Sequence, residues 1–507
     1  MREQSGGHEI LKKNLHANFW GQAITVLLGV VLVPVYLHFL GVEAYGVIGF
    51  FTSLQVLLGF LDLGISPTVT REIAEHKLLP HKAAESQNFV LTLQTVHIFI
   101  GLVIGAGFVL TADGLAQHWL NAEQFSPAVL RKVIFLYAGV FMVRWPILFF
   151  GAVLRGLERQ AVLNQILAGA GILRGIAILI VIIWISPTMT AFLGCQLAVG
   201  ILETGGIAWV AWKAMPASRA HSAKFELKGL KRIWKTAFIF MVLTVLGSLT
   251  DQIDRLIISK LFPLSRLGFY SVAAMIAGYL ALIVSPIFHS LYPRFTVMIA
   301  EKKTQELRDV YHLTSQLVCT LTCPAAGVIL FFSRDILVLW SRSVVVAEQS
   351  AFILSVLILV VLLYALIIVP QALQFAGKNT HLPFWGTFLG LLAMVPGMIS
   401  AAHLWGINGP PVVLLIYRGV YFLLIPNLMH RSILPGENWS WYFRDILPFC
   451  LAGVAIPALA KYGMELFPAP SILRAVLIFL TLAVSYACAF WIYQPFRSRI
   501  KIFFSHR

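Results

Sequence analysis

The first long apolar run of the chain reads FWGQAITVLLGVVLVPVYLHFL and covers residues 19–40. A helix needs about 20 apolar residues to cross the hydrocarbon core of a bilayer. A secretory signal peptide has a shorter apolar core, followed by a cleavage site of small residues. This run is too long for such a core, and no cleavage site of that kind follows it. We therefore expect it to form a first membrane-spanning helix that stays in the protein.

Runs of the same kind recur along the whole chain. Of its 507 residues, 59% are hydrophobic and 12% are charged, and the mean hydropathy is +0.84. A soluble globular protein of this length has about twice that share of charged residues. We count about fourteen candidate spans, beginning near residues 17, 45, 88, 131, 164, 188, 236, 268, 311, 350, 383, 409, 446 and 471. The sequence predicts an all-α integral membrane protein.

The distribution of basic residues predicts the orientation in the membrane. The chain has 38 Lys and Arg residues against 22 Asp and Glu residues. Loops on the cytoplasmic side carry an excess of Lys and Arg, and an inner N-terminus places about 26 of them inside and about 8 outside. Because the number of spans is even, both termini are then cytoplasmic. The basic excess is explained by topology and by attraction to anionic lipids, so we expect no nucleic-acid partner.

A basic segment divides the chain into two sets of helices. We predict an N-terminal lobe at 1–212, a cytoplasmic basic amphipathic linker at 213–235, and a C-terminal lobe at 236–432. Residues 433–507 then hold two further helices and a basic tail. The linker could instead be a solvated basic loop. A faint repeat supports two lobes, since Leu40-Gly-Val-Glu-Ala-Tyr-Gly46 opens the second helix and Phe262-Pro-Leu-Ser-Arg-Leu-Gly268 opens the eighth.

Arginines near the middle of predicted helices are the most informative residues. Arg144, Arg174 and Arg418 lie near the midplane of the fourth, fifth and twelfth predicted helices. Each costs about 2.5 to 3.5 kcal/mol to insert, so it needs a partner or a wet cavity. Glu203, on the sixth helix, is the acid at a suitable depth. Three arginines with one acid predict a cationic cavity, and guanidinium groups bind phosphate oxygens well.

Further charged residues give weaker predictions. Arg255 is a fourth candidate for substrate binding, although Asp251 stands four residues before it and the two could satisfy each other. Asp62 could form a structural pair with Arg71. If they are buried, acids and histidines inside the membrane can carry coupling protons. The candidates for ion coupling are the acids Glu203, Asp251, Asp254 and Asp62, together with His97 and His289.

No pattern typical of catalysis or of a cofactor is found. The sequence contains no nucleotide-binding GxxxxGK[ST] motif and no arrangement typical of a hydrolase. The cysteines have no zinc-site or disulfide spacing; they are Cys195, Cys319, Cys323, Cys450 and Cys488. We expect no catalytic residues, no metal and no cofactor, and therefore no enzyme.

Several motifs resemble those of a known family. They are Phe39-Leu-Gly-Val-Glu-Ala-Tyr-Gly46, Phe60-Leu-Asp-Leu-Gly-Ile-Ser-Pro-Thr-Val-Thr-Arg71, Asp254-Arg-Leu-Ile-Ile-Ser259 and Pro370-Gln-Ala-Leu-Gln-Phe-Ala-Gly377. This pattern is similar to the polysaccharide flippases of the multidrug/oligosaccharidyl-lipid/polysaccharide exporter superfamily. The resemblance implies two six-helix lobes in a V shape with two added C-terminal helices, and alternating access around a cationic cavity. It also implies an undecaprenyl-pyrophosphate-linked oligosaccharide as substrate and a bacterial inner membrane as location. A polysaccharide polymerase and a chain-length regulator are expected partners.

Two other functions are compatible with the composition. A proton- or sodium-coupled antiporter of drugs or organic cations would need an acidic, aromatic-lined cavity, whereas the midplane charges here are mainly arginines. A membrane polymerase or ligase that uses lipid-linked sugars would be expected to have a large outer loop. The longest predicted outer loop, between Thr111 and Arg131, is modest.

Overall fold

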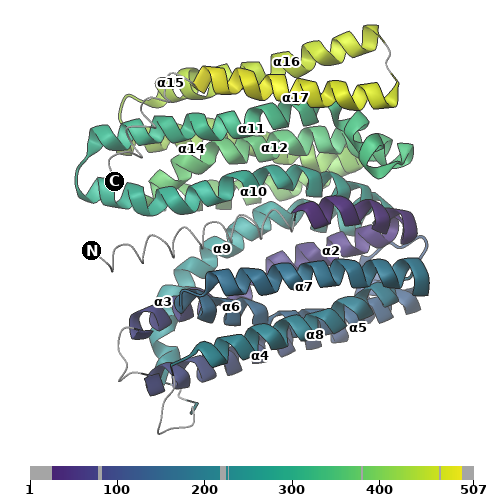
Figure 1. The fold of residues 1–507 in the computed structure, drawn as a ribbon, viewed down its shortest axis with the longest axis vertical. Coiled ribbons are helices and arrows are strands. Elements are labelled where there is room, and N and C mark those ends of the chain that lie inside the picture. Colours follow the sequence, from purple (N-terminus) through teal and green to yellow (C-terminus); the bar gives the residue numbers. More distant parts are fainter. Residues whose placement is uncertain are drawn as a thin grey trace. The chain divides into compact units, whose positions relative to one another are not determined.

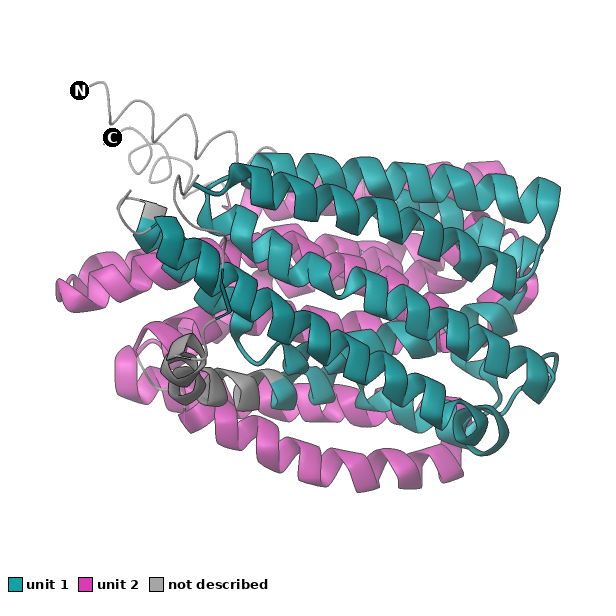
Figure 2. Ribbon diagram, turned by 90° about the horizontal axis from the view of Figure 1, so that it is seen from below, with its two compact units in different colours: residues 1–268 teal, residues 269–507 magenta. Residues whose placement is uncertain are grey.

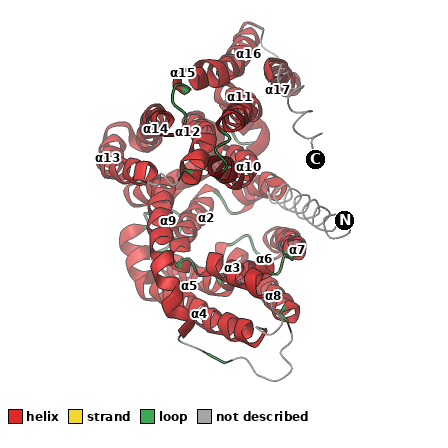
Figure 3. Ribbon diagram, turned by 90° about the vertical axis from the view of Figure 1, so that its left-hand side faces the viewer, coloured by secondary structure: helices red, strands yellow, loops and turns green. Residues whose placement is uncertain are grey.

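The computed structural model describes residues 26–77, 83–216, 224–225, 228–377, 381–467 and 470–493. These residues form helices joined by short connections, and the described part of the chain contains no strand (Figure 3). Among these described residues, 11 stretches of helix are long and apolar enough to cross a membrane, and a shorter apolar helix covers Val26–Phe39. The prediction of an all-α membrane protein is therefore confirmed.

The chain forms two compact units, residues 1–268 and 269–507 (Figure 2). Unit 1 contains an apolar helix at Val26–Phe39. It also contains α2 (Val42–Leu58), η1 (Gly59–Asp62), α3 (Ile65–Lys77), α4 (Ala83–Gly114), η3 (Leu115–Trp119), α5 (Pro127–Arg144), α6 (Pro146–Gly156), α7 (Gln160–Ile180), η4 (Val181–Ile185), α8 (Met189–Ala214) and α9 (Lys228–Leu261).

Unit 2 begins within α10 (Leu264–Ala300) and continues to the C-terminal helices. Its further elements are α11 (Thr304–Ser341), α12 (Val344–Ala376), α13 (His381–Trp405), η5 (Gly406–Asn408), α14 (Gly409–Ile433), α15 (Asn438–Ser440), η6 (Trp441–Ile446), α16 (Leu447–Leu466) and α17 (Ser471–Tyr493). At a rise of about 1.5 Å per residue, most of these helices are long enough to cross a bilayer of about 30 Å.

Local sequence signals fix several helix starts. Ser126 accepts a hydrogen bond from the backbone N–H of Val129 at the start of α5, and proline follows at the first helical position. Thr188 and Ser343 cap α8 and α12 in the same way. A side-chain oxygen at the cap satisfies one of the backbone donors that the first helical turn leaves free.

The helical hydrogen-bond pattern of unit 1 is interrupted at two places. Between α2 and α3 the chain passes through η1 and through positive φ angles of 51° at Leu63 and 72° at Gly64. The fourth span breaks at Trp145, because Pro146 has no N–H to continue the helical pattern. Arg144 is the last residue of α5 and lies well inside the apolar span Pro127–Gly156, and its depth in the membrane stays a prediction.

The outer surface of the helices is apolar, as a lipid-facing surface requires. Leu110 in α4 is 84% exposed and Trp184 in η4 is 74% exposed. Large apolar patches of this kind are rare on soluble monomers. Each unit nevertheless has its own buried core, which in unit 1 includes Phe149, Val153 and Ile207 and in unit 2 includes Phe295, Tyr311 and Trp441. The chain is a multi-pass membrane protein.

The two glycines of the faint repeat lie against each other. A Cβ atom on Gly46 would lie 2.1 Å from the carbonyl oxygen of Leu264, and one on Gly268 would lie 2.1 Å from that of Val42. Both distances are far below van der Waals contact, so the start of α2 and the start of α10 meet backbone to backbone. This close contact explains why glycine stands at both matched positions of the repeat.

The predicted linker at 213–235 lies partly outside the described residues. Helix α8 ends at Ala214, and α9 begins at Lys228 and continues without a break to Leu261. Residues 217–223 and 226–227, like the basic tail after Tyr493, are not described. The boundaries of the lobes and the position of the linker at the membrane surface stay predictions.

Candidate functional site

Glu203 is the centre of a charged cluster inside unit 1. It lies on α8 and is 4% exposed. Its Oε2 atom accepts a hydrogen bond from the guanidinium of Arg174 on α7. The Nε atom of Arg144, at the end of α5, lies 3.4 Å from the same oxygen. One buried carboxylate oxygen therefore lies between two arginines from different helices.

The packing of three helices brings these side chains together. Helix α8 packs against both α5 and α7, as Figure 1 shows for the helices of unit 1. Gly200 lies one turn before Glu203, and a Cβ atom there would lie 3.2 Å from Cγ of Arg144. Thr204 donates a hydrogen bond of 2.8 Å to the carbonyl of Val143, which ties α8 to the end of α5. Gly200 thus leaves room for the side chain of Arg144. The hydrogen bond from Thr204 holds the backbone just before Arg144 against α8.

The cluster carries a net positive charge and remains partly open. The side chains of Arg144 and Arg174 are 26% and 17% exposed, whereas that of Glu203 is 2% exposed. Among the described residues, the Nε atoms of both arginines have no hydrogen-bond partner. Two guanidinium groups against one carboxylate leave one net positive charge. The exposed parts of these guanidinium groups can bind the oxygens of a phosphate or pyrophosphate group.

Aromatic and small side chains surround the arginine pair. The hydroxyl of Tyr36 and the thiol of Cys195 lie within electrostatic range of Arg174. The ring of Tyr36 also packs edge to face on Phe192, with ring centroids 5.3 Å apart. The first helix and α8 therefore line one side of the site.

Arg418 lies on α14 in unit 2, half-buried among aromatic rings. Its guanidinium carbon is 5.3 Å from the ring centroid of Tyr364 and 5.7 Å from that of Tyr417. Cation–π contacts of this kind contribute roughly 0.5 to 2 kcal/mol each. The structure thus brings together two of the three predicted midplane arginines, in unit 1. A shared cavity with Arg418 stays a prediction.

On α9, Arg255 is paired with a residue that the sequence did not suggest. Its guanidinium donates a hydrogen bond of 2.9 Å to Oε1 of Gln252. Asp254 is buried, at 4% exposed, whereas Asp251 is exposed. Whether these three charged residues of α9 bind substrate or carry an ion stays a prediction.

Asp62 binds different residues from the one that we expected. Its carboxylate accepts hydrogen bonds from the backbone N–H and the hydroxyl of Ser66, at 3.1 and 2.7 Å. One of its oxygens lies 3.5 Å from Nδ1 of His97. The expected partner Arg71 is paired instead with Glu72 and Glu75. The interruption between α2 and α3 explains this, because it turns Asp62 toward the start of α3.

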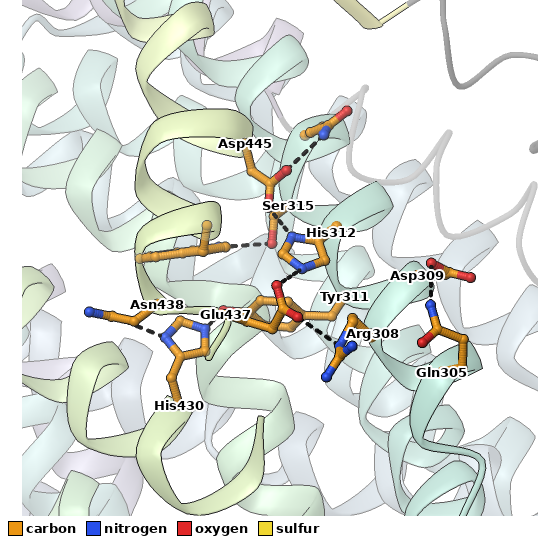
Figure 4. A network of polar contacts seen from close by, with 12 residues as sticks. Gln305, Arg308, Asp309, Tyr311, His312, Ser315, His430, Glu437, Asn438 and Asp445 are labelled. Carbon is orange, nitrogen blue, oxygen red and sulfur yellow. Dashed lines mark hydrogen bonds and ion pairs between the residues drawn. The ribbon is translucent and has the colours of Figure 1, made fainter. Parts of the chain in front are cut away.

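Sequence reasoning missed a second buried network, in unit 2 (Figure 4). The imidazole of His312 on α11 contacts Asp445 of η6 through Nδ1 and Glu437 through Nε2, the second at 3.0 Å. Gln316 donates a hydrogen bond of 2.7 Å to Asp445, and Arg308 lies 2.7 Å from Glu437. A signal existed, since Arg308, His312 and Gln316 follow one another at intervals of four residues on one helix face.

The acids of this second network are buried or nearly so, and its arginine is partly exposed. Asp445 is 0% exposed, and the side chain of Glu437 is 15% exposed. Two acids face one arginine and one histidine, and no side chain of the network is left over to bind an anion. Its contacts join α11 to the turn after α14 and to the start of α16. We therefore interpret it as a structural connection between these elements.

A fold of long apolar helices defines a multi-pass membrane protein, and its charged cluster in unit 1 is half-buried. Residues 11–299, more than half of the chain, match the family model described as polysaccharide biosynthesis protein. The chain therefore belongs to this family, as the resemblance of its motifs suggested.

Individual proteins are similar over most of their length. A candidate O-antigen transporter of Shigella flexneri is 24% identical in an alignment of 409 residues, and the match covers 78% of this chain and 94% of the relative. The solved structure of a lipid II flippase in an inward closed conformation has a TM-score of 0.67 at 16% identity, and covers 96% of this chain and 99% of its own. A multidrug resistance transporter of the MATE family and MOP superfamily has a TM-score of 0.66 at 12% identity, with 89% and 96% covered. The two structures show a shared fold.

Proposed function

We propose that the protein is a flippase for a polyprenyl-pyrophosphate-linked oligosaccharide used in the assembly of a surface polysaccharide. Cargo of this kind would move from the cytoplasmic to the outer leaflet of a bacterial inner membrane. Membership of the polysaccharide biosynthesis protein family and the similarity to an O-antigen transporter support this class of substrate. The observation that carries the proposal is the arginine pair around Glu203, because a pyrophosphate needs cationic partners inside the membrane.

The mechanism that we propose is alternating access around this cationic site. The polyprenyl tail stays in lipid, while Arg144 and Arg174 replace water around the pyrophosphate. Arg418 and Arg255 are further candidates for contact with the cargo. An inside-negative potential favours outward movement of an anion by about 2.3 kcal/mol per charge per 100 mV. We propose that a coupling ion balances the charge of the unloaded cationic site during its return, and that the acids Glu203, Asp251, Asp254 and Asp62 are the candidates to bind it.

A catalytic role is less well supported. The predicted outer loop between Thr111 and Arg131 is shorter than expected, because α4 and η3 extend to Trp119 and α5 begins at Pro127. Seven residues or so cannot form a catalytic domain. We propose a transporter without enzymatic activity, and we expect a polymerase and a chain-length regulator to act on its product.

A leaflet-protection experiment tests the proposal. The purified protein is reconstituted into liposomes with a fluorescent polyprenyl-pyrophosphate-linked oligosaccharide, and a membrane-impermeant reagent reports how much label remains in the inner leaflet. We expect label to equilibrate between leaflets only in vesicles that contain the protein. Transport of an organic cation against a proton gradient, with no movement of the lipid, would instead support a drug antiporter.

A further inference from the structure

Asp62, His97 and Trp145 form a buried cluster where two spans of unit 1 are interrupted. His97 lies on α4 and is 0% exposed. Its Nδ1 atom is 3.5 Å from Oδ1 of Asp62, and its Nε2 atom is 3.3 Å from the carbonyl oxygen of Trp145. The indole of Trp145 stacks on the imidazole, with centroids 4.9 Å apart, and donates a hydrogen bond of 2.9 Å to the carbonyl of His97.

Both ring nitrogens of His97 face oxygens that can only accept a hydrogen bond. A neutral imidazole has one N–H donor and one lone pair, whereas the imidazolium ion has two donors. Either neutral tautomer therefore points a lone pair at the Asp62 carboxylate or at the Trp145 carbonyl. The Nδ1 atom has no hydrogen-bond partner among the described residues. A proton bound there would turn a repulsive contact into an ion pair.

Polar groups from neighbouring elements surround Asp62 and His97. Asp62 faces His97 from η1, and Ser66 at the start of α3 donates to both oxygens of that carboxylate. Arg155 on α6 lies within electrostatic range of Asp62. The ring of Phe149 also packs on the imidazole, with centroids 5.6 Å apart. The hydrogen bonds from Ser66 hold the Asp62 carboxylate in place beside the imidazole.

The cluster is connected to the arginine pair through the interruption at Trp145. Trp145 follows Arg144 directly and precedes Pro146, so a shift of its backbone moves the guanidinium relative to Glu203. The indole is held tightly, since a Cβ atom on Gly101 would lie 2.6 Å from it. Transporters commonly build ion sites where membrane helices are discontinuous. Both interruptions of unit 1 meet at His97.

We propose that Asp62 and His97 form a proton-binding site, and that the proton on Nδ1 of His97 controls the position of Arg144. With the proton bound, the ion pair and the Trp145 contact hold both interruptions together. When it leaves, the Nδ1 lone pair faces the carboxylate and the interruption at Trp145 is released. This inference rests on the proposed function, because it assigns the coupling ion of the same transport cycle.

A measurement without substrate tests the site itself. The protein with ¹⁵N-labelled histidine is studied in nanodiscs by NMR between pH 5 and 9, and the His97 signals are assigned by comparison with His97→Gln. We expect His97 to titrate, and its imidazolium fraction at a fixed pH to fall severalfold in Asp62→Asn. A His97 that does not titrate, or that titrates identically in Asp62→Asn, overturns the proposal.

A second measurement tests the coupling. Flipping is followed in proteoliposomes with and without an imposed pH gradient, for the wild type, His97→Gln and the control His403→Gln, whose histidine is exposed on α13 of unit 2. We expect the gradient to change the wild-type and control rates at least threefold and to leave the His97→Gln rate unchanged. An equal response of all three overturns the coupling. If the wild type flips nothing while His97 titrates as expected, the proposed function fails and the proton site stands.

Discussion

Glu203 and the arginines around it illustrate what single residues reveal. The depth of Arg144 and Arg174 in apolar segments, and the scarcity of acids at that depth, were enough to predict a cationic site with Glu203 as the available acid. The sequence could not show that both arginines bind the same oxygen, because this depends on the packing of α5, α7 and α8. It also could not separate Arg418, which lies in the other unit against tyrosine rings.

Glu203→Gln should destabilise the protein, because it leaves two guanidinium groups without their shared carboxylate. Breaking a fully buried ion pair costs about 3 to 5 kcal/mol. Since the arginine side chains are 26% and 17% exposed, water offsets part of this cost, and we expect roughly half of it. Thermal unfolding in detergent measures the effect. Glu348→Gln removes an exposed partner of Arg334 and should leave the unfolding temperature unchanged; an equal decrease for both variants contradicts this account.

The sequence predicted the membrane-spanning helices well, but it did not predict all of the interruptions and contacts of these helices. Long apolar runs identified the spans because a helix that crosses lipid has few alternatives. The end of the second span near Asp62 was predicted, but the interruption at Trp145 was missed, although Pro146 is a residue of the kind that commonly breaks helices. The network around His312 was missed for another reason. It joins residues more than a hundred positions apart, and such pairings follow from packing that a local pattern does not contain.

The glycine contact between α2 and α10 gives a test at this scale. Gly46→Ala and Gly268→Ala should each lower the unfolding temperature by several degrees, because the added methyl group meets a backbone carbonyl at 2.1 Å. The matched control is Gly278→Ala, also on α10, where nothing lies within 4 Å of the added atom. Alanine is a better helix former than glycine by up to about 1 kcal/mol, so the control should be neutral or slightly stabilising. Equal effects at the three positions would argue against a close backbone contact.

The His312 network should behave as one unit in a double-mutant cycle. We expect His312→Leu and Asp445→Asn each to destabilise unit 2, and the double variant to lose less than the sum, with a coupling of about 0.5 to 3 kcal/mol. Chemical unfolding in detergent measures the change in the free energy of unfolding for each single variant and for the double variant. The exposed pair Arg131 and Asp113, whose side chains are 51% and 58% exposed, serves as the control and should show little coupling. Additive losses at His312 and Asp445 would contradict a shared network.

At the scale of the whole molecule, the apolar runs predict the order of the helices, and the basic residues predict their orientation in the membrane. The predicted orientation is open to direct measurement. In a variant without its five cysteines, Glu301→Cys between α10 and α11 should be labelled from the cytoplasmic side. Gln124→Cys between η3 and α5 should be labelled from the outside, because an odd number of spans separates the two positions. Labelling of both from one side, or with the sides exchanged, would refute the topology.

We propose that the arginine pair of unit 1 binds the anionic group of a lipid-linked sugar during its passage through the membrane. The most direct test measures flipping of a fluorescent polyprenyl-pyrophosphate-linked oligosaccharide by three proteins. They are the wild type, a double variant that carries both Arg144→Ala and Arg174→Ala, and the single variant Arg131→Ala. Arg131 lies on α5 like Arg144, but it is half exposed and paired with Asp113. We predict that the double variant, although folded and inserted, loses at least nine-tenths of the activity and that Arg131→Ala keeps it. Full activity of the folded double variant would contradict the account.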